Sequence, residues 1–319
     1  MTHPCSVVKV FAKSPSPLTV LVVGSGVEHK RSLDLLTSAV PQAALQVMPR
    51  PALNEVRLAS ATSHLAMASG DDMALDGVRA FFDASVTTAS DIEQFIVRAR
   101  GFEERRRAHE LPPDLAPSVV PWSASWADSA TRLGARVAHV FAACGIDATV
   151  DHIGSTSVPG LAAKDIIDLQ VAVRRLEDSE ACDRSLRSAG FVNVQVLAPG
   201  APGVSRDNAR GGEPSSGYWE KRLYASVDAA QRAIVHVRQA GAANWRYALL
   251  FRDWLRANTQ CRDEYALTKS RLAIAHLGDS NFDDYARAKD FWFDRAYEQS
   301  ERWASESGWV APTFGGREE

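Results

Sequence analysis

The sequence lacks the features that mark secreted and membrane-spanning chains. Its 319 residues include four cysteines, Cys5, Cys144, Cys182 and Cys261, and no two of them form a CxxC pair. This scatter argues against a zinc site or a disulfide framework, and we therefore expect a cytoplasmic protein. The N-terminal segment has no continuous apolar stretch of the signal-peptide kind. No run approaches the roughly 20 apolar residues of a membrane span, so we expect no membrane association.

The sequence also lacks a strong excess of charge of either sign. Lysine and arginine total 36 against 39 aspartate and glutamate residues, which gives a formal net charge of −3. This balance offers no global electrostatic attraction for nucleic acid or an anionic membrane, and neither is an expected partner. The 45% hydrophobic and 24% charged residues are typical of a globular protein.

A proline-rich segment predicts a boundary between two domains. Residues 111–117 read Leu-Pro-Pro-Asp-Leu-Ala-Pro and should be extended, and all eight tryptophans follow Pro121. We therefore predict a small α/β domain over residues 1–115 and a second domain over residues 116–319. The charged cluster 103–107 before the boundary is typical of a solvated linker helix, although its arginines could also contact phosphate.

The first domain is predicted to begin, after a loose leader of residues 1–17, with a strand–turn–helix unit. The strand is expected over 18–23 and the helix over 33–39, joined through Gly24-Ser-Gly26. This turn approaches a Walker A loop but lacks its second glycine and its magnesium-binding hydroxyl, which favours an ordinary turn over a reshaped phosphate loop. Residues 41–77 show little periodicity. Further on, Ser90 is expected to cap a helix.

That helix should bury one apolar stripe, which consists of Ile92, Phe95, Ile96 and Ala99. In the second domain, periodicity predicts helices at 126–143, 181–189, 244–257, 262–276 and 282–306. Strands are predicted at 148–153, 166–173, 191–197, 219–226 and 233–238, with a long polar loop over 198–217.

The stretch 151–173 predicts the functional site. A small-residue loop that contains Gly154 and Ser155 separates two strand-like runs, and its backbone amides can face an anion. Asp168 and Gln170 lie two residues apart on the second run, so their side chains share one face of a strand. We therefore predict Asp168 and Gln170 as metal-facing residues beside a phosphate-accepting loop.

This arrangement resembles the nucleotidyltransferase superfamily related to polymerase β. The resemblance implies that the Gly-Ser pair holds nucleotide phosphates while carboxylates on the strand hold divalent metal ions. Gln170 stands where the second carboxylate would be. Because an amide brings no charge, a full two-metal site is in question.

The segment His152–Asp168 further resembles the signature of the GrpB family, a branch of that superfamily. Later blocks at 219–226, 235–238 and 250–258 resemble the family in the same order. The resemblance implies an α/β (α+β) fold, in which a nucleotidyltransferase domain with a mixed sheet flanked by helices follows a small, reduced α/β domain. It also implies that a missing second carboxylate is common. The chain also resembles the GrpB domain fused to dephospho-CoA kinase in actinobacteria, where the kinase comes first. Residues 1–115 are too few for a whole kinase, so the resemblance implies a shortened kinase-like remnant or a new α/β cap there.

Several residues are candidates for the site. Asp168, Ser155 and His236 are the catalytic candidates, and Asp168 and Gln170 are the metal-binding ones. The candidates for holding phosphate are Gly154, Ser155, Lys164, Lys221, Arg222 and Arg238. Each has a structural role as the alternative. Gly154 and Ser155 could form a tight turn, Asp168 could be a polar residue at a strand end, and His236 could be a hydrogen-bonded structural histidine. The basic residues 221, 222 and 238 could lie on a solvated sheet edge. Arg252 and Asp253 are expected to form an ion pair, and Tyr285 and Lys289 share one helical face.

Three functions remain open from the sequence. The first is a GrpB-family nucleotidyltransferase-like protein that binds ATP, another nucleoside triphosphate or a CoA-like phosphate with Mg²⁺ and transfers a nucleotidyl group. The second is a non-catalytic module, related to dephospho-CoA kinase, that binds a nucleotide or a partner protein in a folding or regulatory role. The third is a residual dephospho-CoA kinase. Gln170 favours the second function, and the Gly154-Ser155 loop with its basic neighbours favours the first.

Overall fold

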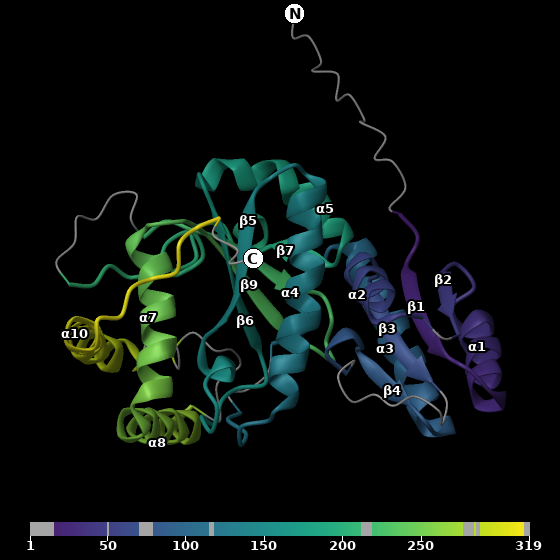
Figure 1. Ribbon diagram of the computed structural model, residues 1–319, viewed down its shortest axis with the longest axis horizontal. Coiled ribbons are helices and arrows are strands. Elements are labelled where there is room, and N and C mark those ends of the chain that lie inside the picture. The colour runs from purple at the N-terminus through teal and green to yellow at the C-terminus, as the bar shows by residue number, and fades with distance from the viewer. Residues whose placement is uncertain are drawn as a thin grey trace, which may run out of the picture.

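The protein is an α/β structure with two separate sheets, each flanked by helices (Figure 1). The computed structural model describes residues 16–49, 51–69, 79–114, 118–211, 219–276, 284 and 288–315. Most of the predicted leader and the predicted site neighbour Tyr285 lie outside these residues. Among the described helices, none combines the length and the apolar composition that crossing a membrane would require.

The first unit is a parallel sheet of four strands in the order β2-β1-β3-β4. Its elements are β1 (Thr19–Gly24), α1 (Val27–Ala39), β2 (Ala44–Met48), α2 (Leu53–Thr62), β3 (Leu65–Ser69), a 3₁₀ turn (Arg79–Phe81), β4 (Ala84–Val86) and α3 (Ala89–Ala108). The predicted run at 18–23 forms β1, which is buried on both faces. Helices α1 and α3 pack on one face of the sheet, and α2 packs on the other.

Two features of this unit differ from the sequence expectation. Residues 41–77 contain β2, α2 and β3, for which the sequence shows no clear periodic pattern. Strand β3, for example, consists of Leu, Ala, Met and Ser and is fully buried, so it shows no alternation, and Ala and Ser have little preference for strands. Helix α3 begins two residues earlier than Ser90 suggests. The Thr88 hydroxyl accepts a hydrogen bond from Asp91 N at 3.2 Å, and the Asp91 carboxylate accepts one from Thr88 N at 2.8 Å. The predicted apolar stripe of α3 is buried, as expected.

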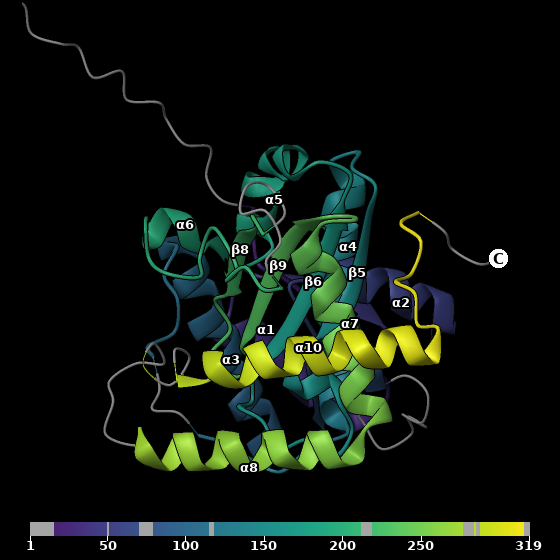
Figure 2. The ribbon, with the colours of Figure 1, turned by 90° about the vertical axis from the view of Figure 1, so that its left-hand side faces the viewer.

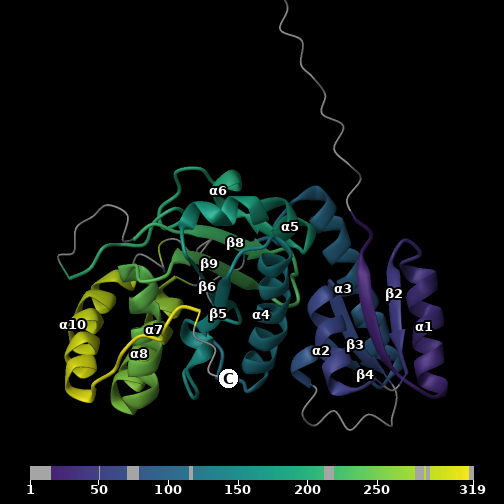
Figure 3. The same cartoon turned by 45° about the horizontal axis from the view of Figure 1, so that its top comes forward.

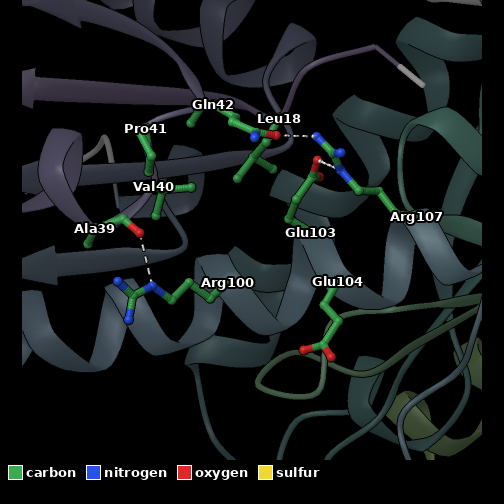
Figure 4. A pocket seen from close by; sticks show the side chains of 10 residues that line it. Leu18, Ala39, Val40, Pro41, Gln42, Arg100, Glu103, Glu104 and Arg107 are labelled. Carbon is green, nitrogen blue, oxygen red and sulfur yellow. Dashed lines mark hydrogen bonds and ion pairs between the residues drawn. The ribbon is translucent and has the colours of Figure 1, made fainter. Parts of the chain in front are cut away.

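A shallow cavity of about 340 Å³ lies at the edge of this unit (Figure 4). Leu18 and Val40 contribute to its apolar wall. Arg100 donates to Ala39 O at 2.9 Å, and Arg107 donates to the Gln42 side chain at 3.2 Å. These guanidinium groups therefore already have acceptors within the protein.

The second unit is a mixed sheet of five strands in the order β5-β6-β9-β8-β7, in which only the β6–β9 pair is parallel. The elements before β8 are α4 (Ser125–Ala143), β5 (Ala148–Ile153), β6 (Ile167–Val173), α5 (Asp183–Ser188), β7 (Phe191–Asn193) and α6 (Val194–Leu197), with 3₁₀ turns at Ser155–Ser157 and Leu176–Cys182. The remaining elements are β8 (Arg222–Ser226), β9 (Ala233–Gln239), α7 (Ala243–Ala257), α8 (Thr259–Ala275) and α10 (Asp290–Ser307). The predicted strand at 191–197 ends at Asn193, whose side chain accepts from Gln195 N at 3.0 Å and starts α6.

The two faces of the second sheet differ in chemistry. The apolar face, which includes Leu169, Val171, Val235 and Val237, packs against α4 in one hydrophobic core. The opposite face carries Asp168, Gln170, His236 and Arg238, because Gln170 pairs with His236 across the β6–β9 ladder and strand side chains alternate. Helix α7 covers part of this polar face through Trp245 and Leu249. The alternation of β6 and β9 thus brings four predicted site residues to one surface.

The two units meet along α4, with α2 and α3 beside it (Figure 3). Arg132 of α4 donates to Ser63 O at 2.9 Å, and Arg136 donates to His64 O. Arg106, in the charged cluster expected to be solvated, is only 2% exposed and pairs with Glu103 at 2.8 Å. That expectation is wrong for Arg106, because its guanidinium points between the two units and donates to Ser188 O at 3.2 Å and to Ser16 O at 2.6 Å.

Candidate functional site

A cleft of about 750 Å³ opens on the polar face of the second sheet. Residues of β6 and β9 form its floor, and residues of α7, α8 and α10, which Figure 2 shows in front of the sheet, form one wall. The aromatic side chains of this wall are Tyr247, Phe251, Tyr265 and Phe293. The cleft therefore joins an apolar wall to a polar floor, as small-molecule sites commonly do.

Gly154 and Ser155 line this cleft next to Asp168. Gly154 has φ +69°, and a Cβ at this position would lie 2.4 Å from Asp168 Oδ2. Only glycine permits this conformation and this close approach. The Gly-Ser turn and the strand aspartate, which the sequence places fourteen residues apart, are therefore in direct contact.

Asp168 presents an ionised carboxylate to the cleft. Its side chain is 29% exposed, and Oδ1 lies 3.4 Å from His236 Nε2. Burial opposes ionisation, but the hydrogen bond from His236 and the charges of Lys164 and Lys289 outweigh it and lower the pKa of Asp168. Asp168 is therefore the cleft group best suited to hold a cation.

His236 orients Asp168 and is not poised to act as a base. Arg238 Nη2, which can only donate, lies 3.5 Å from His236 Nδ1, so Nδ1 accepts and Nε2 carries the proton toward Asp168. Burial and then the charge of Lys221 lower the pKa of His236 to about 4. The ring is therefore neutral near pH 7.

Gln170 lies on the correct strand face, but both ends of its amide are bound inside the protein. The residue is fully buried. Its Nε2 donates to Trp245 O at 3.2 Å, and its Oε1 accepts from Arg238 Nη1 at 2.6 Å. Because a guanidinium already binds the amide oxygen, this arrangement does not offer Gln170 to a metal ion. No group of three metal-binding side chains occurs among the described residues.

The basic candidates divide between the two sides of the sheet. Arg238 lines the cleft, while Lys221 is buried with its Nζ 2.6 Å from Asp207 Oδ1. Burial opposes ionisation of Asp207, but Arg238 and Lys221 overcome it and hold the pKa of Asp207 well below its usual range. Arg222 pairs with Glu180. It alternates with Leu223, which faces His236 across the ladder, so Arg222 lies on the opposite face from the cleft.

Two further lysines interact electrostatically with Asp168, Lys289 directly before α10 and Lys269 on α8. Lys289 lines the cleft, and burial followed by the charge of Lys164 lowers its pKa to about 8. Burial and then the charge of Lys289 lower the pKa of Lys269 on α8 to about 6. The pKa of Lys164 is also lowered by burial, against the attraction of Asp168. The sequence singled out Lys289 through its helical pairing with Tyr285, and it matched both Lys289 and Lys269 to the GrpB family without placing either near Asp168.

Two other sequence expectations have clear structural outcomes. Arg252 and Asp253 form the expected ion pair at 2.8 Å. His152 Nε2 lies 2.9 Å from the Thr156 hydroxyl, and no histidine binds the Ser155 hydroxyl in the described part of the chain. Ser155 therefore suits contact with a phosphate better than attack as an activated nucleophile.

Comparisons with known proteins match the second unit and part of the first. The family model described as GrpB protein matches residues 116–299. A dephospho-CoA kinase of Mycobacterium bovis is 34% identical over 245 residues, which cover 72% of this chain and 59% of that protein. The UPF0157 protein YqkA of Bacillus subtilis is 29% identical over 193 residues, which cover 60% of this chain and 50% of that protein. A crystal structure of GrpB from Enterococcus faecalis matches 58% of this chain and 99% of its own, with 25% identity and a TM-score of 0.46.

Proposed function

This chain belongs to the GrpB family, and we propose that its cleft binds a nucleoside triphosphate or a CoA-like phosphate together with Mg²⁺. The observation that carries the proposal is the contact of Gly154 with Asp168 in a cleft that Ser155 also lines and that has one aromatic wall. The Gly154-Ser155 loop can contact phosphates and the aromatic wall can contact a base, and these are the two parts of a nucleotide. The relatives named dephospho-CoA kinase support a nucleotide or CoA-like ligand, although the match spans only 59% of their length.

The donor set fits one magnesium ion and does not fit two. Mg²⁺ is commonly held by one or two carboxylates together with the phosphates of the ligand. Asp168 supplies one carboxylate, Gln170 is bound by Arg238, and both oxygens of Asp207 are bound by cations. When bound, the ion would neutralise charge on the phosphate oxygens.

The remaining cleft residues have separable tasks in this proposal. Ser155 and the backbone after Gly154 contact phosphate, Arg238 and Lys289 add positive charge, and His236 holds Asp168 in place. The aromatic side chains contact the base or another flat group. With Asp168 as the single metal-binding carboxylate, nucleotidyl transfer from a nucleoside triphosphate is the reaction that we propose to test first.

A non-catalytic nucleotide-binding module, serving a partner protein, is the second candidate. The contact of Gln170 with Arg238 favours it, because a guanidinium occupies the position where a second metal-binding group would act. Kinase activity is not proposed, because the turn after Gly24 lacks the second glycine and the hydroxyl of a Walker A loop.

The proposal predicts magnesium-dependent nucleotide binding that requires Asp168. Calorimetry of the full chain with ATP, CTP, GTP and dephospho-CoA, with and without Mg²⁺, should reveal at least one ligand that binds more tightly with Mg²⁺. Asp168→Asn should weaken that binding by about tenfold or more, since a charge-assisted contact contributes roughly 1.5–3 kcal/mol. Asp178→Asn, which removes a carboxylate from a surface ion pair with Arg175, is the matched control and should have little effect.

Pyrophosphate release then separates the two candidates. A protein that binds a nucleoside triphosphate and releases pyrophosphate supports transfer, whereas tight binding without release supports the non-catalytic module. If none of the four ligands binds with or without Mg²⁺, the proposal is wrong.

A further inference from the structure

Four basic side chains of α7 and α8 donate hydrogen bonds to backbone carbonyls of the segment 152–162. Arg256 makes the strongest contact, donating from Nε and Nη2 to Ser157 O at 3.0 and 2.7 Å. The other three contacts join Arg252 to His152 O, Arg262 to Pro159 O and Lys269 to Ala162 O. We refer to Arg252, Arg256, Arg262 and Lys269 as the carbonyl clamp. It connects two helices to the loop that contains Gly154 and Ser155.

The carbonyl clamp lies behind this loop and not in the cleft. Ser155 is among the cleft-lining residues of the described chain, but no clamp residue is. Figure 2 shows α8 leaving the lower end of α7 in a different direction. The clamp therefore has no direct contact with a ligand in the cleft and can act on it only through the backbone.

The turn after Gly154 connects the carbonyl clamp to the cleft through backbone hydrogen bonds. Gly154 O accepts from both Ser157 N at 3.3 Å and the Ser157 hydroxyl at 2.6 Å, and Ser155 O accepts from Val158 N at 3.2 Å. In a trans peptide the N–H points opposite to the C=O of the same unit, so the N–H groups of Ser155 and Thr156 point away from these carbonyl bonds. Neither N–H has a backbone or side-chain acceptor in the described part of the chain. Ser157, which fixes Gly154 O, is itself fixed by Arg256.

We propose that the carbonyl clamp, with Arg256 at its centre, positions the Ser155 and Thr156 amides toward the cleft and thereby sets the affinity for the phosphate part of the ligand. The inference rests on the proposed nucleotide-binding function and assigns residues that the ligand does not touch. The hydrogen bonds that these side chains donate to Ser157 O and its neighbours hold this peptide segment against rotation, and a rotation would turn carbonyl oxygens toward an anion. Arg256 is a positioning residue in this scheme.

The test compares Arg256 variants of the full chain by calorimetry with Mg²⁺-ATP and with inorganic tripolyphosphate. Arg256→Ala should weaken both by about tenfold and by a similar factor, because the phosphate contact is common to them. Arg256→Lys keeps one donor and the charge and should recover part of the loss. Arg271→Ala removes the same charge from the exposed side of α8 and is the matched control. Circular dichroism should show that all variants remain folded.

Hydrogen exchange of the free protein provides a second measurement. Arg256→Ala should speed amide exchange in a peptide covering residues 153–158 and leave the exchange of α7 nearly unchanged. If the wild type binds the probes but Arg256→Ala binds them equally well, or if Arg271→Ala weakens them as much, the clamp proposal is wrong while the proposed function stands. If the wild type binds neither probe, the clamp proposal is wrong, and the proposed function is wrong as well only if CTP, GTP and dephospho-CoA also fail to bind.

Discussion

Gly154 shows how a single residue couples the loop to the strand. Its positive φ and its contact with Asp168 both require the absence of a side chain, so the backbone of the turn rests directly against the carboxylate. Gly145 offers a useful comparison, because it has φ +72° but a Cβ added there would meet no atom within 4 Å. Both glycines have a positive φ, but only Gly154 lies so close to another side chain that an added Cβ would collide with it.

The first prediction separates these two requirements. Gly145→Ala should lower the free energy of unfolding by about 1–2 kcal/mol through backbone strain alone. Gly154→Ala adds the collision with Asp168, so it should destabilise the protein further and weaken magnesium-dependent nucleotide binding by about tenfold. Denaturant unfolding and calorimetry on both variants provide the measurement. Equal destabilisation and unchanged binding would show that the contact with Asp168 is unimportant.

The sequence indicated which side chains share a strand face, but it did not indicate which partners they bind. The two-residue period of β6 correctly placed Asp168 and Gln170 on one face, and the structure shows that His236 of β9 shares this face. The period could not indicate that Gln170 would bind Arg238 or that Arg222 would face Glu180. Those contacts depend on side chains from other elements, about which a local pattern carries no information.

Helix α3 illustrates the same limit at the scale of one element. Its apolar stripe follows from the 3.6-residue period and was predicted correctly. The start was not, because Thr88 and Ser90 are both acceptable caps by residue type. The structure favours Thr88, whose hydroxyl and backbone N–H both bond with Asp91. Capping depends on the direction in which the chain enters the helix, and the strand β4 sets that direction.

The second prediction concerns this cap. Thr88→Ala should lower the free energy of unfolding by about 1 kcal/mol, because it leaves the N–H of Asp91 without its side-chain acceptor. Ser90→Ala, two residues further along the same helix, should change stability by less than about 0.5 kcal/mol. Urea unfolding of both variants tests the assignment. A larger effect for Ser90→Ala would place the cap where the sequence suggested.

At the scale of the whole molecule, the two units share a buried interface. Val192 and Val227 of the second unit belong to the hydrophobic core of the first. Arg98 of α3 lies 2.7 Å from Asp228 and 3.3 Å from Asp83, so one guanidinium joins carboxylates of both units. The proline-rich segment between α3 and α4 also contributes Leu111 and Asp114 to the cleft. The first unit is therefore part of the environment of the site.

The third prediction concerns the pH dependence of stability. Burial, as the largest cause, lowers the pKa of His64, His152 and His236 to about 4 in the folded protein. Their ordinary value is about 6.5, so between pH 6.5 and 4 the unfolded chain binds more protons than the folded one. The contribution of these three histidines to the free energy of unfolding should therefore be constant above pH 6.5 and should decrease as the pH falls toward 4.

Calorimetric measurement of the melting temperature between pH 8 and pH 4.5 tests whether acidification destabilises the protein. The melting temperature should decrease below about pH 6.5, and His64→Gln, which removes one of the three groups, should make the decrease shallower. His64 lies at the interface, where its Nε2 meets Ser188 O at 2.7 Å, so the variant also reports on the docking of the two units. A melting temperature that rises on acidification would contradict the prediction.

The sequence by itself determined β1, most elements of the second unit and the turn at the centre of the site, because strand alternation, helix periodicity and the need for glycine at a positive φ are local properties of the chain. It also determined the family, through a signature within one short segment. Only the tertiary structure decided that Gln170 faces Arg238, that Arg106 is buried, and that a lysine of α8 and another directly before α10 interact electrostatically with Asp168. Each of these depends on the packing of residues far apart in sequence, where burial and neighbouring charge set what a side chain can do.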